Sequence, residues 1–218
     1  MRVVKVYTVG TKPVGGHYPK VDWGEDVFPT PPTLDDNFDD GLPTTNGPKA
    51  GVPVYGGALP KVVRWAEPAD NPPPDFDSMP TLNISERAKQ VIESVEPDVH
   101  QFFPVEYVDR QDQPIETRYW FYICNRRDTI HPTKSNMMLN GRGLYIPPID
   151  AVRRTLEIPS HLDTKAPGKM VIDSAKLGSE QMWREPRADG MSLMSQTMWE
   201  AIQDAGLTGL QPKQMETV

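Results

Sequence analysis

Residues 79–108 read MPTLNISERAKQVIESVEPDVHQFFPVEYV, and they form the best-specified local unit of the chain. Ser85 is a good helix N-cap, because its hydroxyl can accept a hydrogen bond from an otherwise unpaired backbone N–H. Glu86 follows in the first turn, where the helix dipole favours an anion. Pro97 stops a helix at or before Glu96. The pattern predicts a helix over 85–96, whose apolar face at helical spacing is Ile84, Ala88, Val91, Ile92 and Val95.

Strand-forming residues follow this helix. Residues 102–108 are rich in aromatic and β-branched side chains, interrupted once by Pro104. A polar turn over 109–114 leads to the most apolar stretch, 117–124, which reads TRYWFYIC. Alternation places Tyr119, Phe121 and Ile123 on one face and Trp120, Tyr122 and Cys124 on the other. Because both faces are apolar, we expect a central strand covered on both sides.

The remaining C-terminal elements are shorter. We expect strands over 143–147, 168–173 and 181–184, and a last short strand over 207–210, while 151–158 fits either a strand or a helical turn. A second helix is predicted over 195–205, with Ser195 as N-cap and Gly206 as its left-handed stop. Its apolar face is Met194, Met198, Ala201, Ile202 and Ala205. The predicted fold is α+β, a mostly antiparallel sheet with two packed helices.

The N-terminal part has a different composition. The chain holds 24 prolines and 16 glycines, and many of them lie before residue 79. Strands are predicted over 2–9 and 61–66, and the proline run at 72–74 makes 67–78 the best linker candidate. We therefore divide the chain into a proline/glycine-rich segment, 1–78, which wraps around the outside, and an α+β domain, 79–218.

An acidic run lies inside this N-terminal segment, with no basic residue between Lys20 and Lys49. Three aromatic residues among the acids, Trp23, Phe28 and Phe38, predict an ordered coil pinned to the domain rather than disorder. Two interpretations stay open, a solvated loop and a partner-facing acidic surface. The candidate partner-binding residues are Asp22, Glu25, Asp26, Asp35, Asp36, Asp39 and Asp40.

Composition restricts the classes of function. The chain has 218 residues and a formal net charge of −7, which argues against nonspecific nucleic-acid binding and permits a basic partner. No apolar run approaches the length of a membrane span, and the N-terminus does not resemble a secretory signal. A single cysteine, Cys124, excludes an internal disulfide and fits a reducing compartment, so we expect a cytoplasmic protein.

The sequence holds no recognisable catalytic or cofactor motif. None of the four histidines lies at zinc-ligand spacing from another ligand, and no phosphate-binding glycine-rich loop is present. Cys124 and His131 could act together only if the fold brought them close, and a cysteine in so apolar a strand is usually structural. We expect no cofactor, no metal and no catalysis.

Several motifs in order resemble a family of bacterial immunity proteins from polymorphic-toxin systems, the family named for a myxobacterial prototype and earlier described as a domain of unknown function. The resemblance covers about residues 79–212. In that family an aspartate tends to precede a serine after the aromatic strand; here Ser135 fits, but His131 stands where the acid is expected. The motifs are LNISERA at 82–88, FFPVE at 102–106, the aromatic strand followed by Asn125, Trp183-Arg184, and AGLTGL at 205–210.

The resemblance implies a protein that binds and neutralises one cognate toxin, often delivered by contact-dependent or type VI secretion, without catalysis. Such a protein would act in competition between bacteria. Two alternatives from other classes stay open. One is a small-molecule-binding or enzymatic domain with a dispersed site of Arg126, His131 and Trp183. The other is a structural particle protein, suggested by the proline-rich segment.

Overall fold

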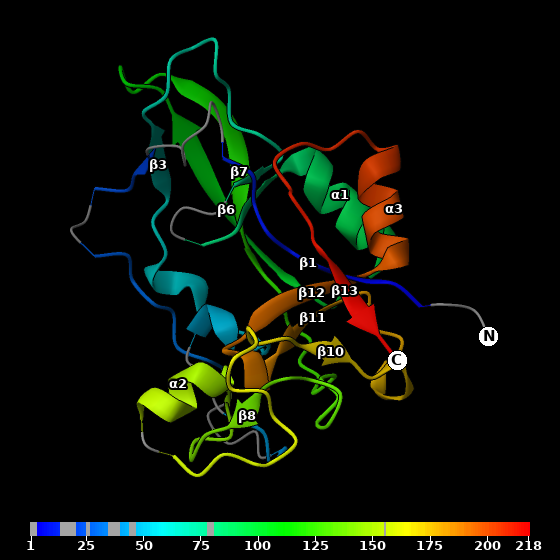
Figure 1. Ribbon diagram of the computed structural model, residues 1–218. Coiled ribbons are helices and arrows are strands. Elements are labelled where there is room, and N and C mark those ends of the chain that lie inside the picture. The colour runs from blue at the N-terminus through cyan, green and yellow to red at the C-terminus, as the bar shows by residue number, and fades with distance from the viewer. Residues whose placement is uncertain are drawn as a thin grey trace.

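The computed structural model describes residues 4–13, 21–24, 27–34, 40–43, 47–77, 81–154 and 156–218. Over these residues it shows three α-helices, two main β-sheets and a two-stranded ribbon (Figure 1). The predicted α+β class and the mostly antiparallel pairing are confirmed. The expectation of one sheet is wrong, because the strands near 102–124 and those near 168–185 belong to different sheets.

The first main sheet has six strands in the order β2-β3-β6-β7-β5-β4, and only the β3–β6 pair is parallel. The predicted central strand is β7, which pairs with β6 on one side and β5 on the other. Cys124 lies two residues beyond its end. The strands are β2 (Val21–Asp22), β3 (Val62–Trp65), β4 (Phe76–Asp77), β5 (Asn83–Ser85), β6 (Gln101–Val108) and β7 (Pro114–Tyr122).

The second main sheet has five strands in the order β10-β13-β1-β12-β11. The sequence did not indicate β12 or β13: Met194 lies in β12 instead of on a helix face, and Leu210 makes only an isolated bridge with Thr11. The last strand, β13, starts at Gln214, four residues after the end of the strand predicted over 207–210. The strands are β1 (Val6–Thr8), β10 (Val171–Ile172), β11 (Met182–Glu185), β12 (Met191–Ser195) and β13 (Gln214–Thr217).

Helices α1 (Glu86–Val95) and α3 (Gln196–Asp204) lie side by side (Figure 1). Their predicted N-caps are confirmed, since Ser85 and Ser195 each accept a hydrogen bond from the backbone N–H three residues later. Gly206 has a φ of +63°, the left-handed conformation expected of a helix stop. The core beneath both helices joins the two sheets. It contains Phe121 of β7 and Ile123 just after β7, together with Met182 and Met194 from the second sheet.

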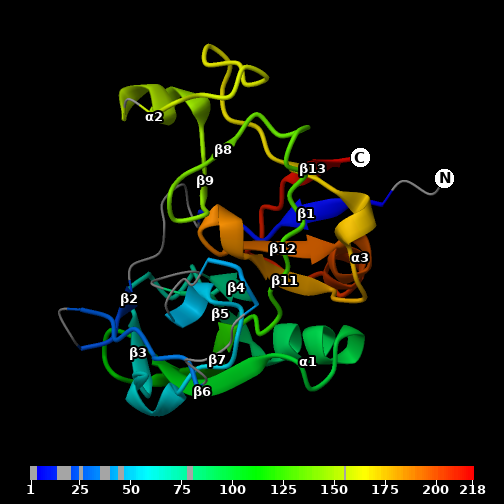
Figure 2. The same ribbon diagram turned by 90° about the horizontal axis from the view of Figure 1, so that it is seen from below.

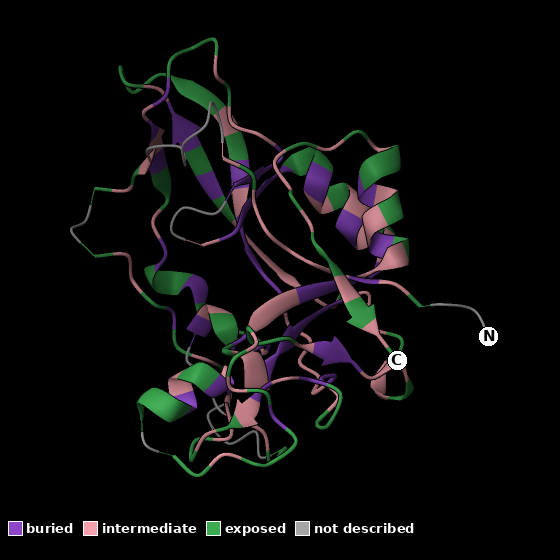
Figure 3. Ribbon diagram, viewed as in Figure 1, coloured by how far each residue is buried: buried purple, intermediate pink, exposed green. Residues whose placement is uncertain are grey.

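The opposite face of β6 and β7 is covered by the N-terminal segment. Trp120 and Tyr122 are buried there with Val54 and Leu59, and the predicted anchors Trp23 and Phe28 pack on this cluster. The Phe28 and Trp120 rings lie 5.0 Å apart. Phe38 lies outside the described residues. In β7 the first four residues are mostly exposed, whereas the residues from Arg118 onward are mostly buried between these two layers (Figure 3). Two short 3-10 turns shape the covering segment, η1 (Gly47–Lys49) and η2 (Gly56–Ala58).

The linker expected over 67–78 is wrong at its C-terminal end. Phe76 is fully buried and pairs with Ile84, and both Asp75 and Asp77 are buried as well. The acids find partners there: Ser85 donates to Asp75, and the Arg118 guanidinium lies 3.2 Å from the Asp77 carboxylate. A proline run does not prevent the next few residues from entering a sheet. The division of the chain at residue 78 stays a prediction.

A smaller lobe lies on the far side of the five-stranded sheet from the six-stranded one (Figures 1 and 2). It contains α2 (Pro148–Arg153), which settles the ambiguous 151–158 stretch as helical at its start. The strand expected over 143–147 shortens to two residues. The ribbon strands are β8 (Met138–Leu139) and β9 (Tyr145–Ile146), and two 3-10 turns follow in the chain, η3 (Ser174–Lys176) and η4 (Pro186–Ala188).

The cap of α1 should contribute measurably to stability. Ser85 is buried, accepts from Ala88 N–H and donates to Asp75 at 2.7 Å, so Ser85→Ala removes a cap and leaves a buried carboxylate short of one donor. We expect the free energy of unfolding, measured in urea, to fall by about 1–3 kcal/mol. The matched control is Ser94→Ala on the exposed side of the same helix, where the change should stay within about 0.5 kcal/mol. Equal effects of the two changes would contradict the assigned role of Ser85.

Candidate functional site

The start of the acidic segment is held to the six-stranded sheet by an arginine. Asp22 lies in edge strand β2, and its carboxylate is 2.9 Å from the Arg64 guanidinium on β3. Arg64 also pairs with Asp112 in the β6–β7 turn. All three side chains are well exposed, so this cluster is solvated and contributes little to folding.

The end of the segment is held more firmly. The Asp40 carboxylate lies 2.8 Å from the guanidinium of Arg126, whose side chain is only 7% exposed. Arg126 also donates to the carbonyls of Pro43 and Ala50, which belong to the covering segment. Burial lowers the pKa of Arg126, and the neighbouring Asp40 opposes that shift. Asp40 is therefore a structural anchor as well as a surface acid.

The other five candidate acids, Glu25, Asp26, Asp35, Asp36 and Asp39, lie outside the described residues. The two that are described stand at opposite ends of the segment and are each paired with an arginine. No feature of the sequence indicates these arginine partners, because Arg64 and Arg126 are distant from the acids along the chain.

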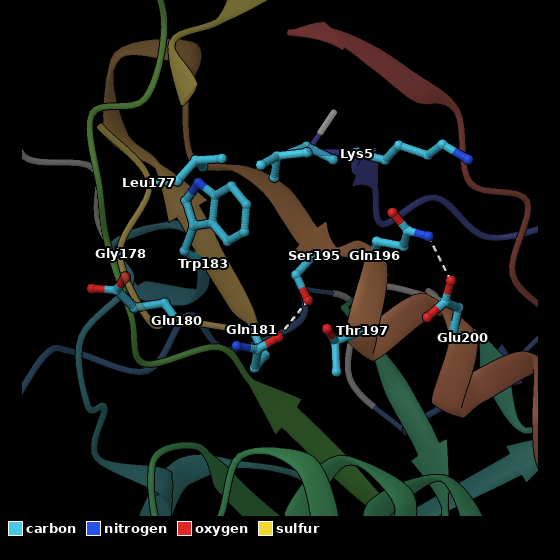
Figure 4. A pocket seen from close by; sticks show the side chains of 12 residues that line it. Lys5, Leu177, Gly178, Glu180, Gln181, Trp183, Ser195, Gln196, Thr197 and Glu200 are labelled. Atoms are coloured by element: carbon cyan, nitrogen blue, oxygen red, sulfur yellow. Dashed lines mark hydrogen bonds between the residues drawn. The ribbon is translucent and has the colours of Figure 1, made fainter. Parts of the chain in front are cut away.

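A cavity of about 260 Å³ lies between the start of α3, β1 and the chain before β11 (Figure 4). Trp183 forms one wall, and Lys5 and Glu200 stand on the other side. Ser195 donates to Gln181 across it, and Gln196 donates to Glu200 at 2.6 Å. The lining residues include neither histidine nor cysteine. Such a cavity can accommodate a small polar group, but its lining does not form a nucleophile–base pair.

The three residues of the dispersed site suggested by the sequence each have different hydrogen-bond or ion-pair partners. Trp183 is buried and donates to Thr129, Arg126 holds Asp40, and the Nδ1 of His131 accepts the backbone N–H groups of Thr133 and Lys134. These are three separate structural roles. The aromatic strand 117–124 and Trp183 do not offer an apolar binding surface either, because Trp120, Phe121, Tyr122 and Trp183 are at most 2% exposed.

Cys124 shows the character expected of a structural cysteine. Burial raises the pKa of its thiol to about 11, so the thiolate that a nucleophile needs is scarce near neutral pH. Its sulfur lies within hydrogen-bond range of Tyr122 O and Gln101, not of His131. Within the described parts of the chain, no group of three or more His, Cys, Asp or Glu residues is arranged to hold a metal ion.

His131 takes the place of the acid that the resemblance led us to expect. Its ring nitrogen accepts two backbone N–H groups of the following turn, at 3.3 and 3.2 Å, as a capping aspartate would. Ser135 then bonds both backbone groups of Val171 and holds this turn against β10. An imidazole can therefore supply the acceptor that this turn requires.

A family model, the immunity protein family (Imm11), matches residues 27–217. The chain belongs to this family of immunity proteins. No curated protein matches the chain. The match starts at residue 27, well before residue 79, where the motifs quoted from the sequence begin. Among the described residues no helix is long and apolar enough to cross a membrane.

The two anchors of the acidic segment should respond differently to mutation. Asp40→Asn leaves the nearly buried Arg126 without its carboxylate, so we expect the free energy of unfolding to fall by about 1–3 kcal/mol, less than for a fully buried pair because Asp40 is partly solvated. Asp22→Asn, the control, should leave the melting temperature unchanged, since Arg64 keeps Asp112. Thermal denaturation of both variants checks this. A stable Asp40→Asn protein would refute the anchor.

Proposed function

We propose that this protein binds one cognate toxin and neutralises it stoichiometrically by covering its active surface. Membership of the immunity protein family supports this proposal most directly. The site geometry is consistent with it, because Asp22 and Asp40, at the two ends of the acidic segment, are each held by an arginine. The protein would act in the cytoplasm of the producing cell, against toxins exchanged between competing bacteria, for example by type VI secretion.

We further propose that the acidic segment makes the first contact with a basic toxin surface. A toxin that acts on nucleic acid needs basic residues around its active site to bind phosphate. The central acids of the segment would complement such a surface and accelerate association by electrostatic steering. The ion pairs of Arg64 with Asp22 and of Arg126 with Asp40 support this proposal, because they hold the two ends of the segment to the domain. The protein itself binds neither nucleic acid nor membrane in this proposal.

Neutralisation can be tested by co-expression with the toxin encoded beside this chain's gene. We expect cells to survive when the two proteins are made together, and a purified one-to-one complex in which the toxin is inactive. The amount of active toxin should fall linearly with added protein, which distinguishes stoichiometric binding from enzymatic destruction of the toxin. Death of cells that contain abundant folded protein would overturn the proposal.

Steering can be tested with Asp35→Asn, Asp36→Asn and Asp39→Asn combined. Asp40 is left intact because it anchors Arg126. We expect the association rate, measured by stopped flow, to fall several-fold, and the wild-type rate to fall as salt rises, since the Debye length is only ~8 Å at physiological ionic strength. The melting temperature should not change.

The matched control changes net charge equally at exposed acids elsewhere on the surface, with Asp70→Asn, Glu157→Gln and Asp204→Asn combined. Its association rate should stay close to that of the wild type, because steering depends on where the charge lies as well as on its total. Equal association rates for the two triple variants would contradict steering by this segment and favour the interpretation of a solvated loop.

A further inference from the structure

Arg184 is a buried cation without a carboxylate partner among the described residues. It lies in β11 and is 9% exposed. Its Nη1 donates to the carbonyl of Gly190 at 3.0 Å and to the hydroxyl of Ser192, both neutral acceptors. Its Nε has no hydrogen-bond partner in the part of the chain that the structure describes. Burial lowers the pKa of Arg184 to about 10, because the charged form is poorly solvated there.

The comparison with Arg118 shows what compensation looks like in this protein. Arg118 is fully buried, and its guanidinium lies 3.2 Å from Asp77 and 2.6 Å from Glu116. These carboxylates outweigh desolvation and raise its pKa. A buried charge without such a partner is costly to maintain. Arg184 is therefore an exception that requires an explanation.

A second unpaired donor is associated with Arg184. The Tyr122 hydroxyl is buried and has no hydrogen-bond partner. Burial raises the pKa of Tyr122, and the charge of Arg184 partly opposes that shift, so the two groups interact electrostatically. Both groups are donors that require an acceptor.

Arg184 also lines the largest of the described cavities, about 580 Å³, between the second sheet and the covering segment. The other polar residues of the lining are Lys49, whose ammonium lies 2.5 Å from the exposed carboxylate of Asp189, and four residues with hydroxyl groups. No acidic residue is among the residues of the lining. Phe28, Val9 and Leu82 form its apolar part. The volume lies within the usual range of small-ligand pockets. The hydroxyls belong to Thr11, Thr30, Thr81 and Ser192.

We propose that this cavity is a binding site for a small organic phosphate. The phosphate would bind between Arg184 and Lys49, because its three acceptor oxygens match a guanidinium fork, an ammonium and neighbouring hydroxyls. The organic part would lie against Phe28 and Leu82. A ligand here would bridge the covering segment and the second sheet. This proposal does not depend on the proposed toxin binding, and the two are tested by separate experiments.

Isothermal titration calorimetry on the full chain tests the site with four probes: adenosine 5′-monophosphate, inorganic phosphate, adenosine and acetate. We expect the nucleotide to bind more tightly than inorganic phosphate, and adenosine and acetate to bind weakly or not at all. No heat from either phosphate compound at millimolar concentration would overturn the proposal. If the nucleotide binds no more tightly than inorganic phosphate, the proposed contact of an organic group with Phe28 and Leu82 is wrong.

Three variants localise the binding. Arg184→Met should weaken nucleotide binding by at least ~10-fold, since it removes a charge-assisted donor. Lys49→Met changes a side chain that is 54% exposed, so the protein should fold normally while binding weakens a few-fold. Arg64→Met, on a remote exposed pair, is the control and should bind like the wild type. If Arg184→Met does not fold, unaltered binding by Lys49→Met is sufficient to reject the site.

Discussion

The carboxylate of Glu96 joins the two sheets of this protein. Glu96 is the C-cap residue of α1, and its oxygens accept from the backbone N–H groups of Gln181 and Met182, at 3.0 and 2.9 Å, where β11 begins. The side chain of Asn125, just after β7, donates to the same carboxylate at 2.8 Å. One buried side chain thus fixes the end of a helix and the exit of the central strand to the edge of the other sheet.

His100 completes this junction from the start of β6. Its Nδ1 accepts the backbone N–H of Cys124 at 3.2 Å, so its proton lies on Nε2, which donates to Glu96 at 3.0 Å. Burial opposes ionisation of Glu96, but donors from His100, Gln181 and Met182 outweigh it and keep the pKa of the carboxyl below its usual value. The ionised form is the one that can accept from all four groups, so charge and hydrogen bonding act in the same direction.

The parts of this architecture that the sequence predicted are those determined by near neighbours in the chain. Ser85 and Gly206 identify helix ends because caps involve only a few residues, and the alternation in 117–124 identifies a buried strand. The Glu96 junction could not be predicted, since its partners lie far away in sequence. The pairing of Asp40 with Arg126 could not be predicted for the same reason. Strand β12 (Met191–Ser195) was not predicted either, because Met194 and Ser195 fit the start of a helix and residues 191–193 alternate weakly.

For the candidate site, composition identified the acidic segment, whereas only the fold shows which acids are engaged. Asp22 and Asp40 look alike in the sequence, yet one belongs to a solvated cluster and the other neutralises a nearly buried arginine. The partners of Arg184 could not be predicted from the sequence either. Its position in an apolar strand does not indicate that no described acid pairs with it, because burial and pairing both arise from contacts between distant segments.

The arrangement of the second sheet has a consequence for biosynthesis. β1 lies between β12 and β13, and Val6 pairs with both Ser195 and Met215. While the chain emerges from the ribosome, the N-terminal strand has no partner until the last strands have been made. Contacts of such long sequence separation form slowly, because a large loop must close first. β1 therefore cannot pair within the second sheet until β12 and β13 have been synthesised.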